Sequence, residues 1–437
     1  MQAMTPIYIE RPPIEETCRQ AIQNPGGLIR IKAPQKMGKT LLLRKTLDYA
    51  RSLGYRTASI DFSEWGPNNS VFNDYDKFQR SLCAEISRCL QMEDEEIESK
   101  ISKTWGITLS PRKSTNYFEK YLLLENEREL VVTFDRFEVL FDKLNIFEDF
   151  CCLLRAWHEK TELQWQNLKL ILVNSTDDYP VLDINHSPFN VGIGVDELTG
   201  LTGFSPLQAK KLLKFYLQED SSRTDELILK DFVDFVGGHP FLLDESFKYL
   251  RRNPTQTLQQ VKEESPTKTG IFNHHLGEIL ETLSKESHEY LKNDYIEIIQ
   301  QYPNSVDLPQ KSAFNLRSLG LIKNADNGCF VSSCDLYRLY FIPSLFMQEV
   351  GQLLSDISPE ITEEEARTLV SNRLNDNLNL GNNQSKWSLV LRRNFFNRDR
   401  LFQSSRAAFF AVVDYYITDS PVGKAAVAFF EEWSDDE

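Results

Sequence analysis

The fold of this chain is decided by residues 28–40, which read LIRIKAPQKMGKT. Residues 28–32 are short, mostly apolar and preceded by the turn pair Gly26-Gly27, a pattern that predicts a buried strand. Residues 39–52 carry apolar side chains at helical spacing, which predicts a helix. A strand, a glycine-containing loop and a helix in direct succession predict a loop whose backbone N–H groups face a phosphate.

The loop between this strand and helix matches the phosphate-loop pattern G-x-x-x-x-G-K-[ST], except that Ala33 replaces the first glycine. We expect Lys39 to reach the β- and γ-phosphates of a nucleotide and Thr40 to ligate Mg²⁺. The other loop residues predicted to bind the nucleotide are Pro34, Gln35, Lys36, Met37 and Gly38. Gly-Lys-Thr could also open an ordinary helix by chance, but the strand before it favours the phosphate loop.

A second motif is the apolar run 130–135, LVVTFD, which ends in an acid. Asp135 would close a strand and order the Mg²⁺ shell beside the phosphate loop. In many such ATPases the next residue is a glutamate that polarises the attacking water, whereas here it is Arg136, which cannot act as a general base. The nearest acid is Glu138, a candidate catalytic residue, and we expect slow or absent hydrolysis. By pattern alone, the run could also be a core strand ending in a surface aspartate.

Two further polar positions are candidates for sensing the nucleotide. Asn174 follows the apolar run 168–173, where it would position water or the γ-phosphate, or else cap a turn. His239 and Pro240 follow a Gly-Gly pair that breaks the preceding helix, and proline suits the first position of the next one. His239 would then lie at a helix start and face the nucleotide, although a lone histidine is as often structural.

Strands expected at 57–62, 130–134 and 168–173 alternate with helical patterns. This order favours an α/β P-loop core of the ASCE/AAA-like kind, with a parallel sheet and helices on both faces. After about Ser205 the pattern becomes helical, and the polar stretch 253–269 predicts a linker or a lid boundary.

Further along, helices precede a short hairpin, residues 320–323 and 329–332, which is the order of elements in a winged helix. The predicted domains are a nucleotide-binding domain (1–203), a helical lid (204–270), a winged-helix-like domain (271–346) and a C-terminal helical adaptor-like domain (347–437).

Composition limits the class of protein. The chain has 437 residues, 41% of them hydrophobic, and a net charge of −15 at pH 7. These values suit packed cores in about two to four domains, whereas the acidic balance disfavours a whole-chain nucleic-acid binder. No apolar run is long enough for a transmembrane helix, and the N-terminus has no signal-peptide pattern. Seven cysteines without paired CxxC motifs fit reduced thiols, so we expect a cytoplasmic protein.

Several segments together resemble a known family, the AAA-like ATPase domain common in cyanobacterial STAND-type proteins. They are YIERP (8–12), QKMGKT (35–40), LLRAWHE (153–159), LVNST (172–176), DINHSPFNV (183–191), GGHP (237–240) and CDLYR (334–338). The resemblance covers about residues 6–345 and implies a core that binds ATP or ADP, a helical lid and a degenerate winged helix. It also implies that Tyr8 and Arg11 contribute to the adenine pocket and that His239 senses the nucleotide. The family's usual Asp-Glu is Asp135-Arg136 here, which puts turnover rather than binding in doubt.

Three functional hypotheses follow. The first is a nucleotide-dependent signalling switch whose residues 347–437 recruit a protein partner; nucleotide-dependent oligomers and a bacterial defence role follow only by family association. The second is a DNA-engaging ATPase related to origin-recognition or transposition regulators. The winged-helix order supports it, while the net acidity and a recognition helix with only Lys311 and Arg317 oppose it. The third is a non-binding scaffold, which Ala33 and Arg136 motivate.

Overall fold

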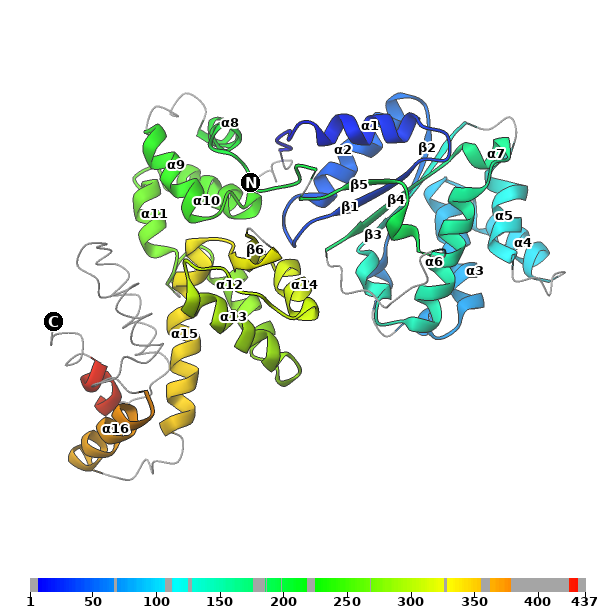
Figure 1. Ribbon diagram of the computed structural model, residues 1–437. Coiled ribbons are helices and arrows are strands. Elements are labelled where there is room, and N and C mark those ends of the chain that lie inside the picture. The colour runs from blue at the N-terminus through cyan, green and yellow to red at the C-terminus, as the bar shows by residue number, and fades with distance from the viewer. Residues whose placement is uncertain are drawn as a thin grey trace. The chain divides into compact units, whose positions relative to one another are not determined.

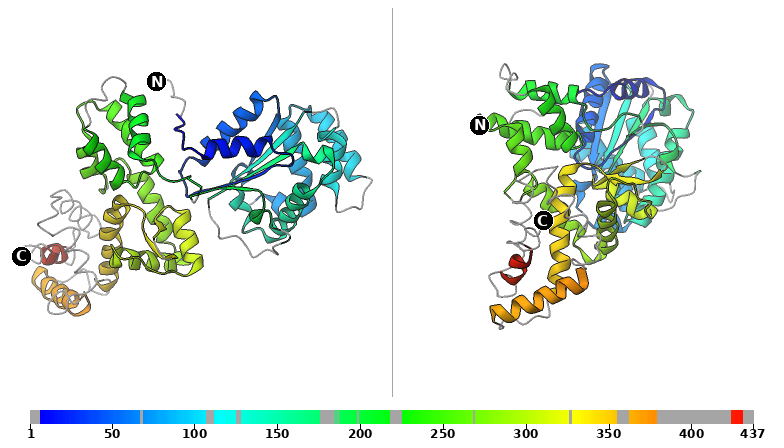
Figure 2. Two further views of the ribbon diagram at one scale, coloured as in Figure 1. Left: turned by 45° about the horizontal axis from the view of Figure 1, so that its top comes forward. Right: turned by 60° about the vertical axis from the view of Figure 1, so that its left-hand side comes forward.

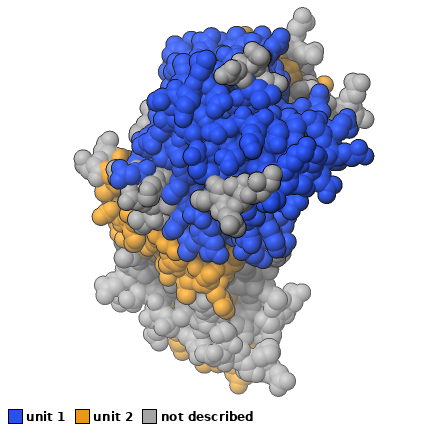
Figure 3. Space-filling view, turned by 90° about the vertical axis from the view of Figure 1, so that its right-hand side faces the viewer, with its two compact units in different colours: residues 1–203 blue, residues 204–437 orange. Residues whose placement is uncertain are grey.

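The computed structural model describes residues 7–66, 69–106, 112–124, 128–175, 185, 187–197, 199–217, 225–267, 269–325, 328–354, 362–378 and 424–430. The chain forms two compact units, residues 1–203 and 204–437, which Figure 3 colours blue and orange. Each unit has its own buried apolar core, so each is described by itself below.

The first unit is built on a parallel five-stranded sheet with the strand order β2-β3-β4-β1-β5 (Figure 1). The strands are β1 (Leu28–Lys32), β2 (Arg56–Asp61), β3 (Leu130–Asp135), β4 (Leu168–Asn174) and β5 (Ile193–Val195). Every residue of β3 and β4 is buried, as expected for central strands covered on both faces. The predicted α/β P-loop core is confirmed. The edge strand β5 was not predicted, because three residues including Gly194 carry too little periodicity.

Helices cover both faces of this sheet (Figures 1 and 2). One face carries α1 (Ile14–Gln23) and α2 (Lys39–Ser52). The other carries α3 (Tyr75–Cys89), α4 (Asp94–Trp105), α5 (Lys113–Tyr117), α6 (Leu144–Glu159), α7 (Leu163–Gln166) and the short turns η1 (Phe62–Trp65), η2 (Ser70–Asn73), η3 (Phe118–Leu122), η4 (Phe137–Leu140) and η5 (Pro188–Asn190). β4 shows the division: Ile171 and Val173 pack with α1 and α2, whereas Leu170 and Leu172 pack on the other side. The sequence did not predict α1.

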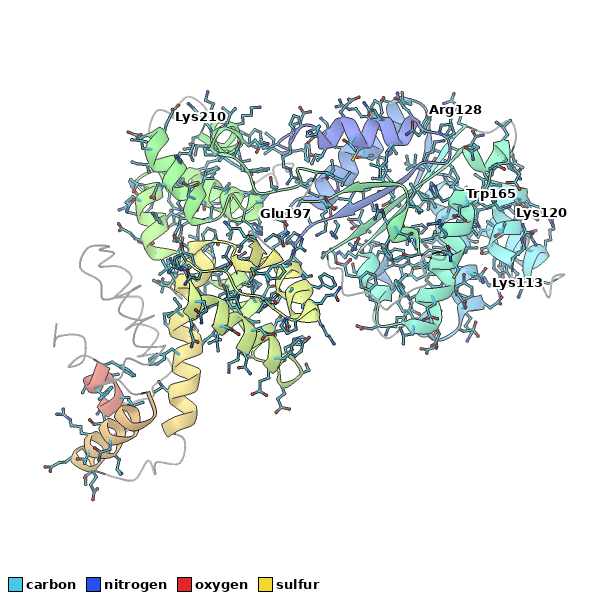
Figure 4. The ribbon with its side chains drawn as sticks, in the orientation of Figure 1. Lys113, Lys120, Arg128, Trp165, Glu197 and Lys210 are labelled. Atoms are coloured by element: carbon cyan, nitrogen blue, oxygen red, sulfur yellow. The ribbon has the colours of Figure 1, made fainter. Side chains whose placement is uncertain are left out.

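An aromatic cluster fills the second face close to the carboxyl ends of β2 and β3. Phe62 stacks on Phe134 with 5.9 Å between ring centroids, and Phe137 and Phe150 complete the group. Farther along this face, Trp165 (labelled in Figure 4) packs against the Trp157 ring. Aromatic pairs in such geometries add roughly 0.5–1.5 kcal/mol each beyond their buried area. The cluster therefore supports the strand ends that carry Asp61 and Asp135.

The second unit is mainly helical. Its elements are α8 (Pro206–Leu217), α9 (Glu226–Phe235), α10 (Pro240–Arg252), α11 (Leu258–Glu264), α12 (Asn273–Leu283), η7 (Glu286–His288), α13 (Glu289–Gln301), α14 (Gln310–Ser318), β6 (Ile322–Asn324), β7 (Phe330–Ser332), α15 (Asp335–Leu354) and α16 (Glu363–Leu378). Lys210 of α8 (labelled in Figure 4) pairs with Glu226 of α9. The strands β6 and β7 pair antiparallel after α14, so the predicted helix-then-hairpin order is present.

Residues 253–269, expected to be a linker or a lid boundary, are not a plain linker. They contain α11, which a capping box opens: the Thr257 side chain accepts from the Gln260 N–H, and the Gln260 side chain accepts from the Thr257 N–H. Buried Leu258 and Val261 anchor this helix, and two apolar residues are too few to give a clear helical period.

Some predictions concern the end of the chain. The expected boundary at 346/347 lies inside α15, which is continuous from Asp335 to Leu354. The expected capping box before α16 is present, since the Thr362 N–H donates to Glu365 Oε2 at 3.1 Å. Residues 424–430 are helical. The other helices expected near 385–395 and 403–417 lie outside the described residues. In the described part of the chain, no helix is long and apolar enough to cross a membrane.

Gly192, next to the edge strand β5, allows a test of the packing of β5 on β1. A Cβ atom on Gly192 would lie 2.4 Å from the Leu28 carbonyl oxygen, and its φ of +71° already disfavours a side chain. Gly66 has the same φ of +71° with nothing within 4 Å of its Cβ position. We expect Gly192→Ala to lower the midpoint of thermal unfolding by several degrees more than Gly66→Ala, because only Gly192→Ala adds a backbone clash.

The measurement is circular dichroism of the full chain during heating, with Gly66→Ala as the matched control for the left-handed backbone. Equal midpoints for the two variants would show that β5 does not pack on β1 as described.

Candidate functional site

The phosphate loop lies between β1 and α2, as the sequence predicted. Two of its residues, Lys36 and Gly38, have left-handed backbones, with φ of 59° and 89°. Gly38 directly precedes α2, and its Cβ position would lie 3.1 Å from Arg11 Nη2, so glycine is suited to this turn on two counts. Ala33 has no left-handed backbone and is buried, which explains why the loop accepts alanine where the pattern has glycine.

Lys39 is a half-buried lysine whose side chain folds back onto the phosphate loop. Its Nζ donates to the carbonyl oxygens of Ala33 and Pro34 at 2.8 and 2.9 Å. Burial lowers the pKa of this ammonium to about 8, and the negative charges of Glu138 and Asp135 partly oppose that shift. A half-buried ammonium that donates to two neutral carbonyls can exchange them for phosphate oxygens, which carry negative charge.

Thr40, at the start of α2, is hydrogen-bonded to Asp135, at the end of β3. Thr40 Oγ1 donates to Asp135 Oδ2 at 3.2 Å, and Asp135 Oδ1 accepts from the Arg136 backbone N–H at 2.9 Å. Burial raises the pKa of Asp135 and the nearby charge of Asp61 adds to this, while the Arg136 N–H and Thr40 bonds lower it.

The pair Thr40 and Asp135 suits Mg²⁺ in its chemistry. A hydroxyl and a carboxylate are hard oxygen donors, and Mg²⁺ is commonly held by one or two such groups together with waters and substrate phosphates. Among the described residues, no group of three His, Cys, Asp or Glu side chains could hold a metal ion. An ion at Thr40 and Asp135 would therefore depend on the phosphates for its remaining ligands.

Arg136 is turned toward the end of β2. Its backbone is left-handed, with φ 54°, and its Nη1 donates to Ser63 Oγ at 2.7 Å. Its Nε lies 3.6 Å from Asp61 Oδ2, and Asp61 is the register partner of Asp135 on the neighbouring strand. The position that usually carries a catalytic glutamate is therefore engaged with Asp61 and Ser63.

Glu138 lies one turn farther on, in η4, and is half-buried. Its charge is the first of those that favour the ammonium form of Lys39. Glu138 Oε2 is buried without a hydrogen-bond partner among the described residues. A carboxylate oxygen with this capacity left near Lys39 can accept a proton or orient a water.

Asn174 ends β4, the strand between β1 and β3. It is 3% exposed, and its Cα pairs in register with Lys32, the residue directly before the phosphate loop. Parallel pairing thus brings Asn174 to the same edge of the sheet as Lys39, Thr40 and Asp135.

Tyr8 and Arg11 form a polar cluster beside the phosphate loop. Arg11 is 3% exposed and its Nη1 donates to the Met37 carbonyl at 2.9 Å. Glu15 Oε1 accepts from the Tyr8 hydroxyl and from the Arg11 backbone N–H, each at 2.6 Å. Burial lowers the pKa of Arg11, and burial with the charge of Glu15 raises the pKa of Tyr8. The sequence did not single out Glu15, whose only signal was an acid in the first turn of a helix after Arg11.

His239 and Pro240 belong to the second unit. His239 precedes α10 and Pro240 is its first residue, as predicted. Both are buried, and the His239 ring lies 6.2 Å from the ring of His275, whose Nε2 is 3.0 Å from the Tyr337 hydroxyl. His239 therefore lies within a buried aromatic cluster of the second unit.

The sequence and the fold both have counterparts among known proteins. The model of the AAA-like domain family matches residues 1–343. No curated protein matches the chain.

The fold also resembles solved structures at low identity. One is the Walker-type ATPase PABY2304 of Pyrococcus abyssi, with 16% identity, a TM-score of 0.48, and coverage of 76% of this chain and 95% of that chain. Another is Cdc6p from Pyrobaculum aerophilum, with 15% identity, a TM-score of 0.38, and coverage of 79% and 97%. A third is a DNA replication initiation factor, with 12% identity, a TM-score of 0.38, and coverage of 95% and 93%. Because the family match spans most of the chain and includes the phosphate loop, Asp135 and Asn174, the chain belongs to the AAA-like domain family.

Proposed function

We propose that this chain binds ATP or ADP with Mg²⁺ at its phosphate loop and acts as a switch with slow or absent hydrolysis. One observation carries the proposal: the half-buried Lys39 ammonium donates to the loop carbonyls of Ala33 and Pro34, next to the hydrogen-bonded pair Thr40 and Asp135. Membership of the AAA-like family adds nucleotide binding in general.

The binding step follows from electrostatics. Nucleotide phosphates would replace the two carbonyl oxygens as partners of Lys39 and would add negative charge to that of Glu138 and Asp135. The loop N–H groups and the start of α2 would add their positive ends. Thr40 and Asp135 would hold Mg²⁺, which supplies charge neutralisation for the phosphates.

Slow hydrolysis is supported by the direction of Arg136. Its guanidinium is held by Ser63 and Asp61 and cannot accept a proton. We assign Glu138 as the group that would polarise water, and Asn174 as the group that would position it. Because Glu138 lies on η4 rather than directly after Asp135, its carboxylate departs from the usual arrangement, and weak turnover is the expected result.

The remaining roles rest on the resemblance and on the position of the residues. Tyr8 and Arg11 would flank the adenine, and His239 with Pro240 would respond to the nucleotide. A signalling role, a protein partner for residues 347–437, nucleotide-dependent oligomers and a part in bacterial defence rest on the resemblance alone.

A DNA-engaging ATPase is the second candidate, which the α14-then-hairpin order supports. The ammonium of Lys311 in α14 lies over the Tyr290 ring at 5.8 Å, which leaves a weak basic face on this helix. Because DNA binding needs positive charge and the chain carries −15, the switch is the better supported function. A scaffold that binds no nucleotide is the third, and the first experiment below separates it from the switch.

Removing the Lys39 ammonium should weaken nucleotide binding. We expect Lys39→Ala to weaken binding of ATP and ADP with Mg²⁺ by about tenfold or more, since charge-assisted hydrogen bonds contribute roughly 1.5–3 kcal/mol each. The measurement is isothermal titration calorimetry. Lys45→Ala is the matched control, because Lys45 is an exposed lysine of the same helix whose ion pair with Glu10 is on the surface. No binding by the native chain would exclude the switch and leave the scaffold.

Nucleotide affinity should also fall as the pH rises through 8. Burial lowers the pKa of Lys39 to about 8, so the side chain is largely charged at pH 7 and largely neutral at pH 9. Phosphates favour the charged form, so binding at pH 9 must take up a proton, and affinity should fall by about tenfold between pH 7 and 9. Calorimetry at both pH values measures this. Lys39→Arg, which stays charged throughout, should show a flat profile; an equally flat native profile would contradict the assignment.

The role of Glu138 can be tested by phosphate release. We expect the native chain to release phosphate from ATP at below about 0.01 s⁻¹, the range of P-loop switches without a stimulating partner. Glu138→Gln should slow this by about tenfold or more, as loss of a general base does. Glu64→Gln, at an exposed acid, is the control. An unchanged rate in Glu138→Gln, or no release over hours by the native chain, would remove the catalytic role of Glu138.

A further inference from the structure

A cavity of about 270 Å³ lies in the second unit, where α8 and α10 end and α9 and α11 begin (Figure 1). Its lining residues fall between positions 217 and 259, so one unit alone forms it. Leu250, in the last turn of α10, lies roughly 16 Å along that helix from His239, because a helix rises about 1.5 Å per residue. The cavity is therefore separate from the Gly-Gly-His-Pro motif at the other end of α10.

The apolar part of the lining comes from all four helices. Leu250 and Leu258 are buried, Leu217 is half-buried, and Ile228 is 41% exposed. No charged side chain is among the described residues that line the cavity. A charged molecule would lose water there without gaining an opposite charge, so the cavity suits an uncharged one.

The polar part of the lining comes from the turn between α10 and α11 and contains Gln256. Gln256 Oε1 is buried and has no hydrogen-bond partner among the described residues. A buried acceptor without a partner is unfavourable, so a donor that reaches this oxygen is favoured. Gln256 thus gives an otherwise apolar cavity one directional acceptor.

Hydrogen bonds hold the walls of the cavity in place. The Tyr216 hydroxyl donates to Asp244 Oδ1 at 2.6 Å and joins α8 to α10. The turn is fixed by the Gln256 N–H, which donates to the Asn253 carbonyl at 3.0 Å, and by Asn253 Nδ2, which donates to the Tyr249 carbonyl at 2.9 Å. The capping box then fixes the start of α11. A molecule that enters would meet a formed cavity, which lowers the entropic cost of binding.

We propose that this cavity is a binding site for a small uncharged molecule with an apolar ring and one hydrogen-bond donor, which the Gln256 amide oxygen accepts. Its volume is close to the lower end of the range of ligand cavities, about 300–1,000 Å³. A leucine or phenylalanine side chain of a partner protein would fill the apolar part but leave Oε1 unpaired. The inference does not rest on nucleotide binding, since no residue of the phosphate-loop core lines the cavity.

The requirement for a donor can be tested with indole and benzofuran, which have the same ring shape but carry an N–H donor and an oxygen, respectively. Saturation-transfer difference NMR on the full chain without nucleotide measures both affinities. We expect indole to bind with a Kd of about 1 mM, as suits so small a molecule. Indole should bind about fivefold more tightly than benzofuran, because one hydrogen bond supplies roughly that difference. In Gln256→Met the two affinities should agree within about twofold, since the acceptor is lost.

The position of the site can be tested by a matched pair of substitutions on α9. Ile228 lines the cavity, whereas its neighbour Leu227 is 75% exposed and does not line it. Ile228→Asp puts an unpaired charge into the wall and should weaken indole binding by about tenfold or more. Leu227→Asp should stay within about twofold of the native chain. Both variants carry the acid in the first turn of α9, where it favours the helix, and circular dichroism checks that both are folded.

Loss of the preference for indole in Gln256→Met, with loss of binding in Ile228→Asp and not in Leu227→Asp, supports the site. Equal affinities of the native chain for the two probes overturn the donor requirement and fit an apolar side chain of a partner protein instead. No saturable binding of indole by the native chain, or unchanged binding in Ile228→Asp, overturns the site itself. The nucleotide titrations decide the proposed function separately.

Discussion

Parallel pairing of β1, β4 and β3 is the constraint on which the candidate site depends. Parallel strands end at the same edge of a sheet, so Asn174 at the end of β4 pairs in register with Lys32, and Asp135 ends the next strand. This arrangement lets Thr40 Oγ1, at the start of α2, reach Asp135 Oδ2 at 3.2 Å. The buried aromatic cluster behind β2 and β3 keeps that edge in place, since Phe62 and Phe134 stack directly beneath it.

The charges at this edge divide into two groups. Lys39 lies near Glu138 and Asp135, and phosphates would stabilise its ammonium because burial has removed part of the water that would otherwise solvate that charge. Arg136 instead neutralises Asp61, the register partner of Asp135. This pairing engages the guanidinium with Asp61, while Glu138 keeps one buried oxygen without a hydrogen-bond partner among the described residues. Tight binding with weak turnover is the chemistry that such a division favours.

The two units are joined by a segment whose ends are bonded on each side of Gly203. Arg11 holds Thr202 in the first unit, and Gly238 holds Phe204 in the second. The turn at Gly237 and Gly238, which accepts the Phe204 bond, has two left-handed residues. It packs so closely against Ser333 and Cys334 that only glycine fits at position 237. The Gly-Gly-His-Pro motif thus has a backbone role that is separate from any role of the His239 ring.

The sequence by itself determined the phosphate loop, four of the five strands and the identities of Lys39, Thr40 and Asp135, because these depend on local periodicity and on one motif. The short strand β5 and the helix α11 could not be predicted, since their few apolar residues gain meaning only from the surfaces that bury them. Where Arg136 points, how close Glu138 comes to Lys39, and which carbonyls Arg11 holds were decided by tertiary structure alone. Those contacts join residues up to 191 positions apart, and no local pattern specifies which distant groups the fold will bring together.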